Sequence, residues 1–319
     1  MKGIVKSMTK IAFGLMAGLF SAAVLAQPYP TRPVQWIVTF DAGSSTDTIS
    51  RAMQPSFSAR LGQPVVVMNR PGASGTIGAL AVANAAPDGY TVGFLAMGAT
   101  AMVPHFRKLA YDLDSFDFIC QIYSAPVLVM VAPNSPHRDI KSLLAFGKAN
   151  PDKMFYGSPG IGTPDHINTA NFLRQNGVPG THVPFKGSGA TAAALKTGEI
   201  ALLTNTTVLL RAHQLRPLAA LTAKRLPELP DVPTAAEFGP PVEASIWSVL
   251  VAPRGLPGEA KAKLEDACRS TLEDPAYRAL AERGGFPPAF RDGKTTEAFV
   301  KSELAKYGPI IKAEGLERQ

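Results

Sequence analysis

The chain lacks the residue patterns of several common functions. Its 32 Lys and Arg residues are scattered among 25 Asp and Glu residues, without the basic block or aromatic-basic interleaving that a nucleic-acid surface requires. The phosphate cradle G-x-x-x-x-G-K-[ST] is missing, as is the nucleophile elbow G-x-S-x-G, and "GSPGIG" spaces its glycines wrongly for a dinucleotide fingerprint. The five histidines are dispersed, with no pair at zinc-ligand spacing. We therefore expect no nucleic-acid partner, no metal and no cofactor.

Cysteine is also scarce, since the chain has only Cys120 and Cys268. An oxidising compartment would permit a disulfide between them. However, a chain with ample apolar core does not require one, and two distant cysteines do not form a disulfide framework. Cys120 lies in an apolar run and Cys268 in a helical pattern, so we predict two buried thiols.

No stretch is long and apolar enough for a membrane span, but the first 26 residues have the pattern of a secretory signal peptide. Lys2, Lys6 and Lys10 precede an apolar run, and the run ends in Val24-Leu25-Ala26. Cleavage after Ala26 would leave 293 of the 319 residues, and loss of three lysines would lower the formal net charge from +7 to +4. We predict secretion through a cleaved signal peptide.

The remaining sequence alternates between strand-like and helix-like stretches. This order predicts an α/β protein of two lobes, each a mostly parallel sheet flanked by helices, with ligands at the carboxyl ends of the strands. Strands are expected at 34–39, 65–68, 91–96, 118–123, 127–132, 155–157, 182–185, 200–204, 218–221 and 247–252. Helices are expected at 47–61, 77–86, 139–149, 164–176 and 189–197 and over most of 258–314.

Three loops between an expected strand and an expected helix are rich in glycine and hydroxylated residues. They are "DAGSSTD" (41–47), "GSPGIGTPDH" (157–166) and "FKGSGA" (185–190). Backbone N–H groups and hydroxyls at a helix N-terminus form a seat for anions. Each loop alone could be an ordinary turn with an N-cap, such as Ser45 or Thr46. Together, the three loops favour anion binding.

A hydrolytic site is the main chemical alternative. Ser158, Asp165 and His166 are the residue types of a catalytic triad, but Asp165 directly precedes His166 and would rarely orient it. An activated nucleophile needs a base that a third group orients, and the sequence indicates no such group.

Several stretches resemble a known family, the Bug-type periplasmic solute-binding receptors of tripartite tricarboxylate transporters. The resemblance spans nearly the whole mature chain and is carried by "YPTRPVQWIVTFDAGSSTD", "LGQPVVVMNRPGASGTIG", "PDGYTV", "GSPGIGTPDH", "HVPFKGSGA" and "LPDVPTAAEFG". It implies a Venus-flytrap fold of the type II kind that holds a carboxylate between its lobes. It also implies a binding function without catalysis and delivery of the ligand to membrane components of a transporter.

The resemblance places the ligand-binding residues in the three loops. The predicted set is Asp41, Gly43, Ser44, Ser45, Thr46 and Asp47 in the first loop, Ser158, Gly160, Gly162, Thr163 and His166 in the second, Phe185, Lys186 and Gly187 in the third, and Asn205.

The chain departs from the family pattern at the first and third loops. Thr39 and Ser44 replace a usual Pro and Gly, and Phe185 replaces a usual Tyr. Asp41 adds an acid beside the proposed anion seat. Its carboxylate could point to solvent, pair with Arg51 or Lys186, or bind a positive or donor group on the ligand.

The resemblance also sets the expected domain organisation. Lobe I would comprise 27–110 and 223–319, lobe II 111–222, and hinges would lie near 104–123 and 222–245. The leading hypothesis is a monomeric receptor for a small organic acid or amino acid. The alternatives are a ligand sensor for a signalling partner and a periplasmic hydrolase that uses Ser158 and His166.

Overall fold

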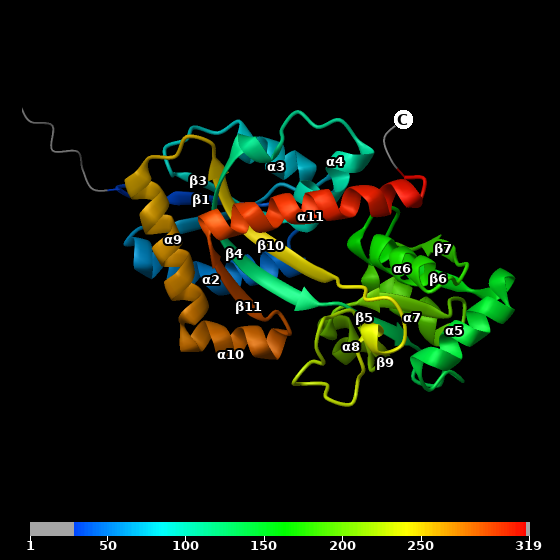
Figure 1. Cartoon of the computed structure of the whole chain (residues 1–319). Coiled ribbons are helices and arrows are strands. Elements are labelled where there is room, and N and C mark those ends of the chain that lie inside the picture. Colours follow the sequence, from blue (N-terminus) through cyan, green and yellow to red (C-terminus); the bar gives the residue numbers. More distant parts are fainter. Residues whose placement is uncertain (1–28, 317–319) are drawn as a thin grey trace, which may run out of the picture.

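The computed structural model describes residues 29–316, which form two β-sheets flanked by helices (Figure 1). The predicted leader, residues 1–26, lies outside this part of the chain. No helix within 29–316 is long and apolar enough to cross a membrane.

The first sheet has six strands in the order β11-β4-β10-β3-β1-β2. The pairs β1–β2 and β1–β3 are parallel, whereas β10 pairs antiparallel with both β3 and β4, and β11 antiparallel with β4. The strands are β1 (Val34–Val38), β2 (Val65–Asn69), β3 (Thr91–Ala96), β4 (Phe116–Pro126), β10 (Ser245–Pro253) and β11 (Pro288–Asp292).

The second sheet has five strands in the order β7-β6-β8-β5-β9. β6 is parallel to β7 and β8, whereas β5 is antiparallel to β8 and β9. The strands are β5 (Leu128–Val131), β6 (Phe155–Ser158), β7 (Thr181–Pro184), β8 (Leu202–Asn205) and β9 (Arg216–Ala220). Both sheets are therefore mixed. The expected parallel pairing holds for β2-β1-β3 and β7-β6-β8, but β10 runs opposite to β4 because it returns from the second sheet.

Helices pack on both faces of each sheet (Figure 1). The first sheet is covered by α2 (Ser45–Leu61), α9 (Gly258–Glu273) and α10 (Pro275–Gly284) on one face, and by α3 (Thr76–Ala83), α4 (Val103–Phe106) and α11 (Gly293–Ala313) on the other. The second sheet carries α5 (Ile140–Ala149), α6 (Pro164–Gln175), α7 (Ser188–Thr197) and α8 (Thr207–His213). Short helical turns lie at η1 (Ala73–Gly75), η2 (Gly98–Met102), η3 (Leu113–Ser115), η4 (Pro151–Lys153) and η5 (Ala235–Glu237).

Alternation along β1 explains why the first sheet is covered twice. Successive side chains of a strand point to opposite faces. Trp36 is fully buried and packs edge-on against Phe57 of α2, with ring centroids 5.0 Å apart. Ile37 faces the other way, into the cluster that contains residues of α3 and α11. Because both faces are buried, β1 reads as a nearly continuous apolar run.

Two segments of the chain cross between the sheets. The first passes from β4 to β5 at Val127, and the second returns from the second sheet to β10 at Ala244. These crossings lie side by side, because the Val127 N–H donates to the Ala244 carbonyl (3.3 Å) and the Leu221 N–H to the Val127 carbonyl (2.8 Å). The first crossing therefore comes later than the hinge expected near 104–123. The domain boundaries stay a prediction, although β4, which they assign to lobe II, pairs entirely within the first sheet.

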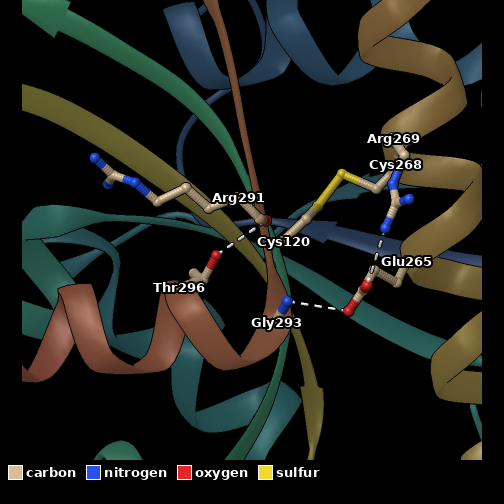
Figure 2. Close-up of a disulfide and its surroundings, with 7 residues drawn as sticks. All are labelled: Cys120, Glu265, Cys268, Arg269, Arg291, Gly293 and Thr296. Carbon is tan, nitrogen blue, oxygen red and sulfur yellow. Dashed lines mark hydrogen bonds and ion pairs between the residues drawn. A yellow bond between two sulfur atoms is a disulfide. The ribbon is translucent and has the colours of Figure 1, made fainter.

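The prediction of two free thiols is wrong, because Cys120 and Cys268 form a disulfide (Figure 2). Cys120 lies in β4 and Cys268 in α9, with Cα atoms 6.7 Å apart. Nearby, Glu265 of α9 accepts the N–H of Gly293 (3.0 Å) at the start of α11. The pairing depends on how α9 packs on β4, and the spacing of the two cysteines in the sequence carries no information about that packing.

Candidate functional site

The topology brings the three glycine-rich loops toward the junction of the two sheets. β4 runs parallel to β1 and β3, so its carboxyl end at Pro126 lies at the same edge as theirs. The chain then enters the second sheet, where Leu128 is paired with Asn205, the last residue of β8. β6 and β7 run parallel to β8, so the loops that follow them lie at the same end of the second sheet as Asn205, near the crossover. This is where α/β sheets bind ligands.

The first loop ends at the N-terminus of α2. Ser44 is the N-cap, rather than Ser45 or Thr46, and its hydroxyl accepts the Asp47 N–H at 3.3 Å. The N–H groups of Ser45 and Thr46 have no acceptor among residues 29–316. The hydroxyls of Ser45 and Thr46 lie on the same turn and add to these N–H groups as possible ligand contacts. The Thr46 hydroxyl is 3.0 Å from the Ser44 hydroxyl. A long helix thus presents open donors at its positive end.

Asp47 holds this loop in place. Its carboxylate accepts hydrogen bonds from the Gly43 N–H (2.9 Å), the Arg51 guanidinium (3.0 Å) and the Asn69 amide (2.9 Å). Burial raises the pKa of Asp47, but the bonds from Arg51, Gly43 and Asn69 outweigh burial and leave the pKa below its usual value. Gly43 adopts φ +82°, which favours glycine. Because its carboxylate is occupied by these three donors, Asp47 stabilises the loop and is not free to contact a ligand.

Asp41 is exposed at the start of the loop and forms no ion pair within the described chain. The expected pairing with Arg51 is wrong, because Arg51 pairs with Asp47. The expected pairing with Lys186 is also not formed, and Lys186 is likewise exposed. Of the three expectations for Asp41, solvent exposure and contact with a ligand group remain.

The second loop is held by hydrogen bonds within itself. The hydroxyls of Ser158 and Thr163 both donate to the Gly160 carbonyl at 2.8 Å, and the Gly162 N–H donates to His166 Nδ1 at 3.0 Å. Thr163 is the N-cap of α6 and accepts the His166 N–H at 3.4 Å. Gly160 (φ +153°) and Gly162 (φ +75°) provide the conformations that this turn needs. A Cβ atom on Gly162 would lie 3.1 Å from the ring of Phe106 in α4, so this loop contacts the first lobe.

Two histidines that are 16 positions apart in the sequence meet behind the second loop. The rings of His166 and His182 stack with centroids 3.7 Å apart, and Tyr156 lies 5.2 Å from His182. Burial, with a smaller effect of His182, lowers the pKa of His166 to about 4, and burial also lowers the pKa of His182. Both rings are therefore neutral at physiological pH. Sequence reasoning missed His182, because its place beside Tyr156 depends on the register of β6 and β7.

The third loop leads from β7 into α7. The Phe185 N–H donates to the Ser158 carbonyl at 2.9 Å, which joins this loop to the second. Gly187 (φ +92°) is the N-cap of α7 and has no side chain that could accept the first N–H groups of the helix. Those of Ser188, Gly189 and Ala190 have no acceptor in the part of the chain described. The second lobe thus presents an open helix N-terminus of its own.

Asn205 binds a buried acid behind these loops. Its amide donates to the Asp165 carboxylate at 2.6 Å, and its oxygen accepts the Thr206 N–H at 2.8 Å. Burial raises the pKa of Asp165 to about 7, although the bond from Asn205 acts in the opposite direction. Burial raises the pKa of Tyr123 in β4, and the neighbouring Thr206 hydroxyl partly offsets this rise. Asn205 therefore supports the junction of the lobes.

The geometry does not form the hydrolytic site that the sequence left open. The Ser158 hydroxyl lies 2.7 Å from Nε2 of His182, not against His166. Neither histidine bonds a carboxylate within residues 29–316, and the Asp165 carboxylate is bonded to Asn205 instead. The same part of the chain contains no group of three acidic, histidine or cysteine side chains that could hold a metal ion.

Comparison with known proteins gives a consistent result. Residues 49–316 match the model of the tripartite tricarboxylate transporter family receptor. The periplasmic binding protein BugD is 29% identical, with a TM-score of 0.77 over 91% of this chain and 100% of its own. Rpa4515 of R. palustris, solved with adipate, is 31% identical, with a TM-score of 0.81 over 91% and 100%.

MatC of Rhodopseudomonas palustris, solved with malate, is 29% identical, with a TM-score of 0.75 over 89% of this chain and 100% of its own. These likenesses cover both sheets and confirm the two-lobed α/β fold of the periplasmic binding proteins. The chain belongs to the receptor family of the tripartite tricarboxylate transporters.

Proposed function

We propose that this protein acts in the periplasm as a monomeric receptor. It captures a small carboxylate between its lobes and delivers it to the membrane components of a tripartite transporter. The family is one of receptors rather than enzymes. Two of its solved neighbours carry the dicarboxylates adipate and malate. The ligand proposed for this chain is an organic acid or amino acid of similar size.

The observation that carries the proposal is the open N-terminus of α2. The free N–H groups of Ser45 and Thr46, with their hydroxyls, favour a carboxylate by hydrogen bonding and by the helix dipole. Asp47 holds this turn in place without competing for its outward donors. A second carboxylate of the ligand would approach the N-terminus of α7 and the exposed Lys186.

A thermal-shift screen tests the function. Adipate, malate, succinate and aspartate are added to the mature protein, and a ligand of the native state raises the melting temperature by mass action. Mass spectrometry of the recovered ligand then distinguishes receptor from hydrolase. Intact ligand is expected, and turnover would contradict the proposal.

The role of the α2 N-terminus is tested by comparing Ser45→Ala with Ser45→Pro. Ser45 is the first residue of α2, a position that proline tolerates, and Ser44 already has the extended backbone (φ −67°, ψ 163°) that precedes proline. Ser45→Ala removes the hydroxyl, whereas Ser45→Pro also removes the N–H. A lost hydrogen bond to a charged group costs about 1.5–3 kcal/mol, so we expect Ser45→Pro to bind roughly ten- to a hundredfold more weakly than Ser45→Ala.

The unliganded melting temperature of both variants serves as the control for folding. Equal affinity of the two variants for every acid that binds the wild type would remove the α2 N-terminus from the site. The absence of any stabilising acid in an extended screen would contradict the receptor function itself.

A further inference from the structure

The second loop depends on a side chain outside it. Tyr156 and Ser158 lie on β6, His182 on the neighbouring edge strand β7, and His166 in the first turn of α6. His182 stacks on His166 and, through Nε2, contacts the Ser158 hydroxyl at 2.7 Å. It therefore touches both ends of the loop that runs from Ser158 to His166.

The direction of each hydrogen bond follows from counting protons. The Gly162 N–H donates to Nδ1 of His166, so the neutral ring of His166 carries its proton on Nε2. The Ser158 hydroxyl has a single proton and donates it to the Gly160 carbonyl at 2.8 Å. Ser158 must then accept from His182, which therefore carries its proton on Nε2 as well. The result is a directed chain from His182 through Ser158 to the Gly160 carbonyl.

This chain uses up the polar capacity of Ser158. Its oxygen also receives the Gly160 N–H at 3.2 Å, and the side chain is fully buried. Ser158 therefore has no free donor or acceptor for a ligand, and its hydrogen bonds only hold the loop in place. At the tip of the loop, Ile161 is 67% exposed, and its N–H has no acceptor within residues 29–316.

We propose that His182 is a positioning residue for ligand binding, which fixes the 158–166 loop through the Ser158 hydroxyl and the ring of His166. The inference rests on the proposed receptor function and adds a residue that touches no ligand. Without His182, the Ser158 proton is free to turn away from Gly160, and His166 loses its stacking partner. The loop then samples other conformations in the free protein. Binding must restrict the loop to one conformation, and the free-energy cost of this ordering reduces affinity.

Substitution at this position is expected to leave the fold intact. His182 is half-exposed on an edge strand, so its replacement opens no cavity in the core. His182→Phe keeps an aromatic ring but removes the N–H donor, and His182→Gln keeps a donor near the same place but removes the ring. Ser158→Ala removes the acceptor. His213→Phe changes a half-buried histidine of α8 whose side chain forms no hydrogen bond in the described chain, and it is the matched control.

The binding test uses calorimetry with adipate and malate as probes. We expect His182→Phe to weaken binding at least tenfold, His182→Gln to recover part of the loss, and His213→Phe to bind like the wild type. The double variant with Ser158→Ala should lose little more than either single variant, because both changes break the same bond. Additive losses, or affinity unchanged by His182→Phe, would overturn the proposal.

A second readout needs no ligand. Nitrogen-15 NMR of the free protein reports which ring nitrogen carries the proton. We expect His182 and His166 both protonated on Nε2, and a changed spectrum of His166 in His182→Phe. Protonation of His182 on Nδ1 alone would overturn the proposal. If no carboxylate binds the wild type, the receptor function fails, and these spectra still decide whether His182 organises the loop.

Discussion

Removing the charge of Asp165 should change how stability depends on pH. Asp165 is buried in the first turn of α6 and has one side-chain donor, Asn205, for its carboxylate. Burial raises its pKa from 3.8 to about 7. The unfolded chain thus releases this proton at about pH 4, while the folded chain holds it until about pH 7. The native state accordingly loses stability as pH rises through this window.

The size of the effect follows from the shift. A difference of one pKa unit corresponds to about 1.4 kcal/mol, so a shift of about three units gives a penalty of about 4 kcal/mol above pH 7. Asp165→Asn keeps an oxygen that can accept the Asn205 amide and removes the charge. The variant should therefore gain stability relative to the wild type as pH rises from about 4 to 7, by up to about 4 kcal/mol.

His166 and His182 act in the opposite direction. Their pKa values are lowered, so the unfolded chain binds protons more readily, and the native state gains stability as pH rises toward the ordinary histidine value. The wild type should consequently show a shallow pH profile. Asp165→Asn should reveal the rising slope that the histidines produce.

The assay is urea unfolding of wild type, Asp165→Asn and Asp152→Asn between about pH 4 and pH 8. Asp152 is exposed in η4, so its variant should follow the wild type at every pH. Parallel profiles for wild type and Asp165→Asn would refute the reasoning, as would a relative gain that grows toward acidic pH.

Other predictions concern the disulfide, the loops and closure. Reduction of the disulfide should cost the wild type about 2–5 kcal/mol of folding free energy and so lower its melting temperature. The melting temperature of a Cys120→Ala/Cys268→Ala variant should not change with reductant. Gly162→Val should lose about 1–3 kcal/mol of stability in urea unfolding, because φ +75° is strained for valine and its Cβ would crowd Phe106; Gly177→Ala, with open space around it, should lose less. Asp41→Asn should reduce the preference for aspartate over succinate by more than tenfold if Asp41 binds the ammonium group, and equal effects on both acids would exclude that role. Small-angle scattering should show a smaller radius with saturating ligand, and identical curves would contradict hinge closure.

The sequence predicted most elements because their patterns are local. β3 has the expected bounds of 91–96, and α5 (Ile140–Ala149) differs from the expected 139–149 only in that Asp139 is its N-cap. β11 was missed. Its residues 288–292 belong to the tail that was expected to be mostly helical, and they form a strand only because β4 offers an edge for pairing.

The site was predictable in outline but not in its internal contacts. Glycine and hydroxyl content marked the loops at 41–47, 157–166 and 185–190, since open donors at helix starts have a local signature. The roles of Asp47, Ser158 and Asn205 as supports could not be seen, because their partners Asn69, His182 and Asp165 are fixed by three-dimensional packing. The same holds for the Cys120–Cys268 bond.

That bond has a consequence for how the protein withstands proteases. Cys120 and Cys268 are 148 residues apart in the sequence, and every strand of the second sheet lies between them. The disulfide therefore closes a covalent ring that contains the second sheet, and the bond itself lies in the core of the first lobe. A single cut anywhere between the two cysteines opens the ring without releasing a fragment. The nicked chain would keep its mass on a non-reducing gel and separate into two pieces only after reduction. In a compartment rich in proteases, the second lobe can thus be cut once and still remain attached to the first.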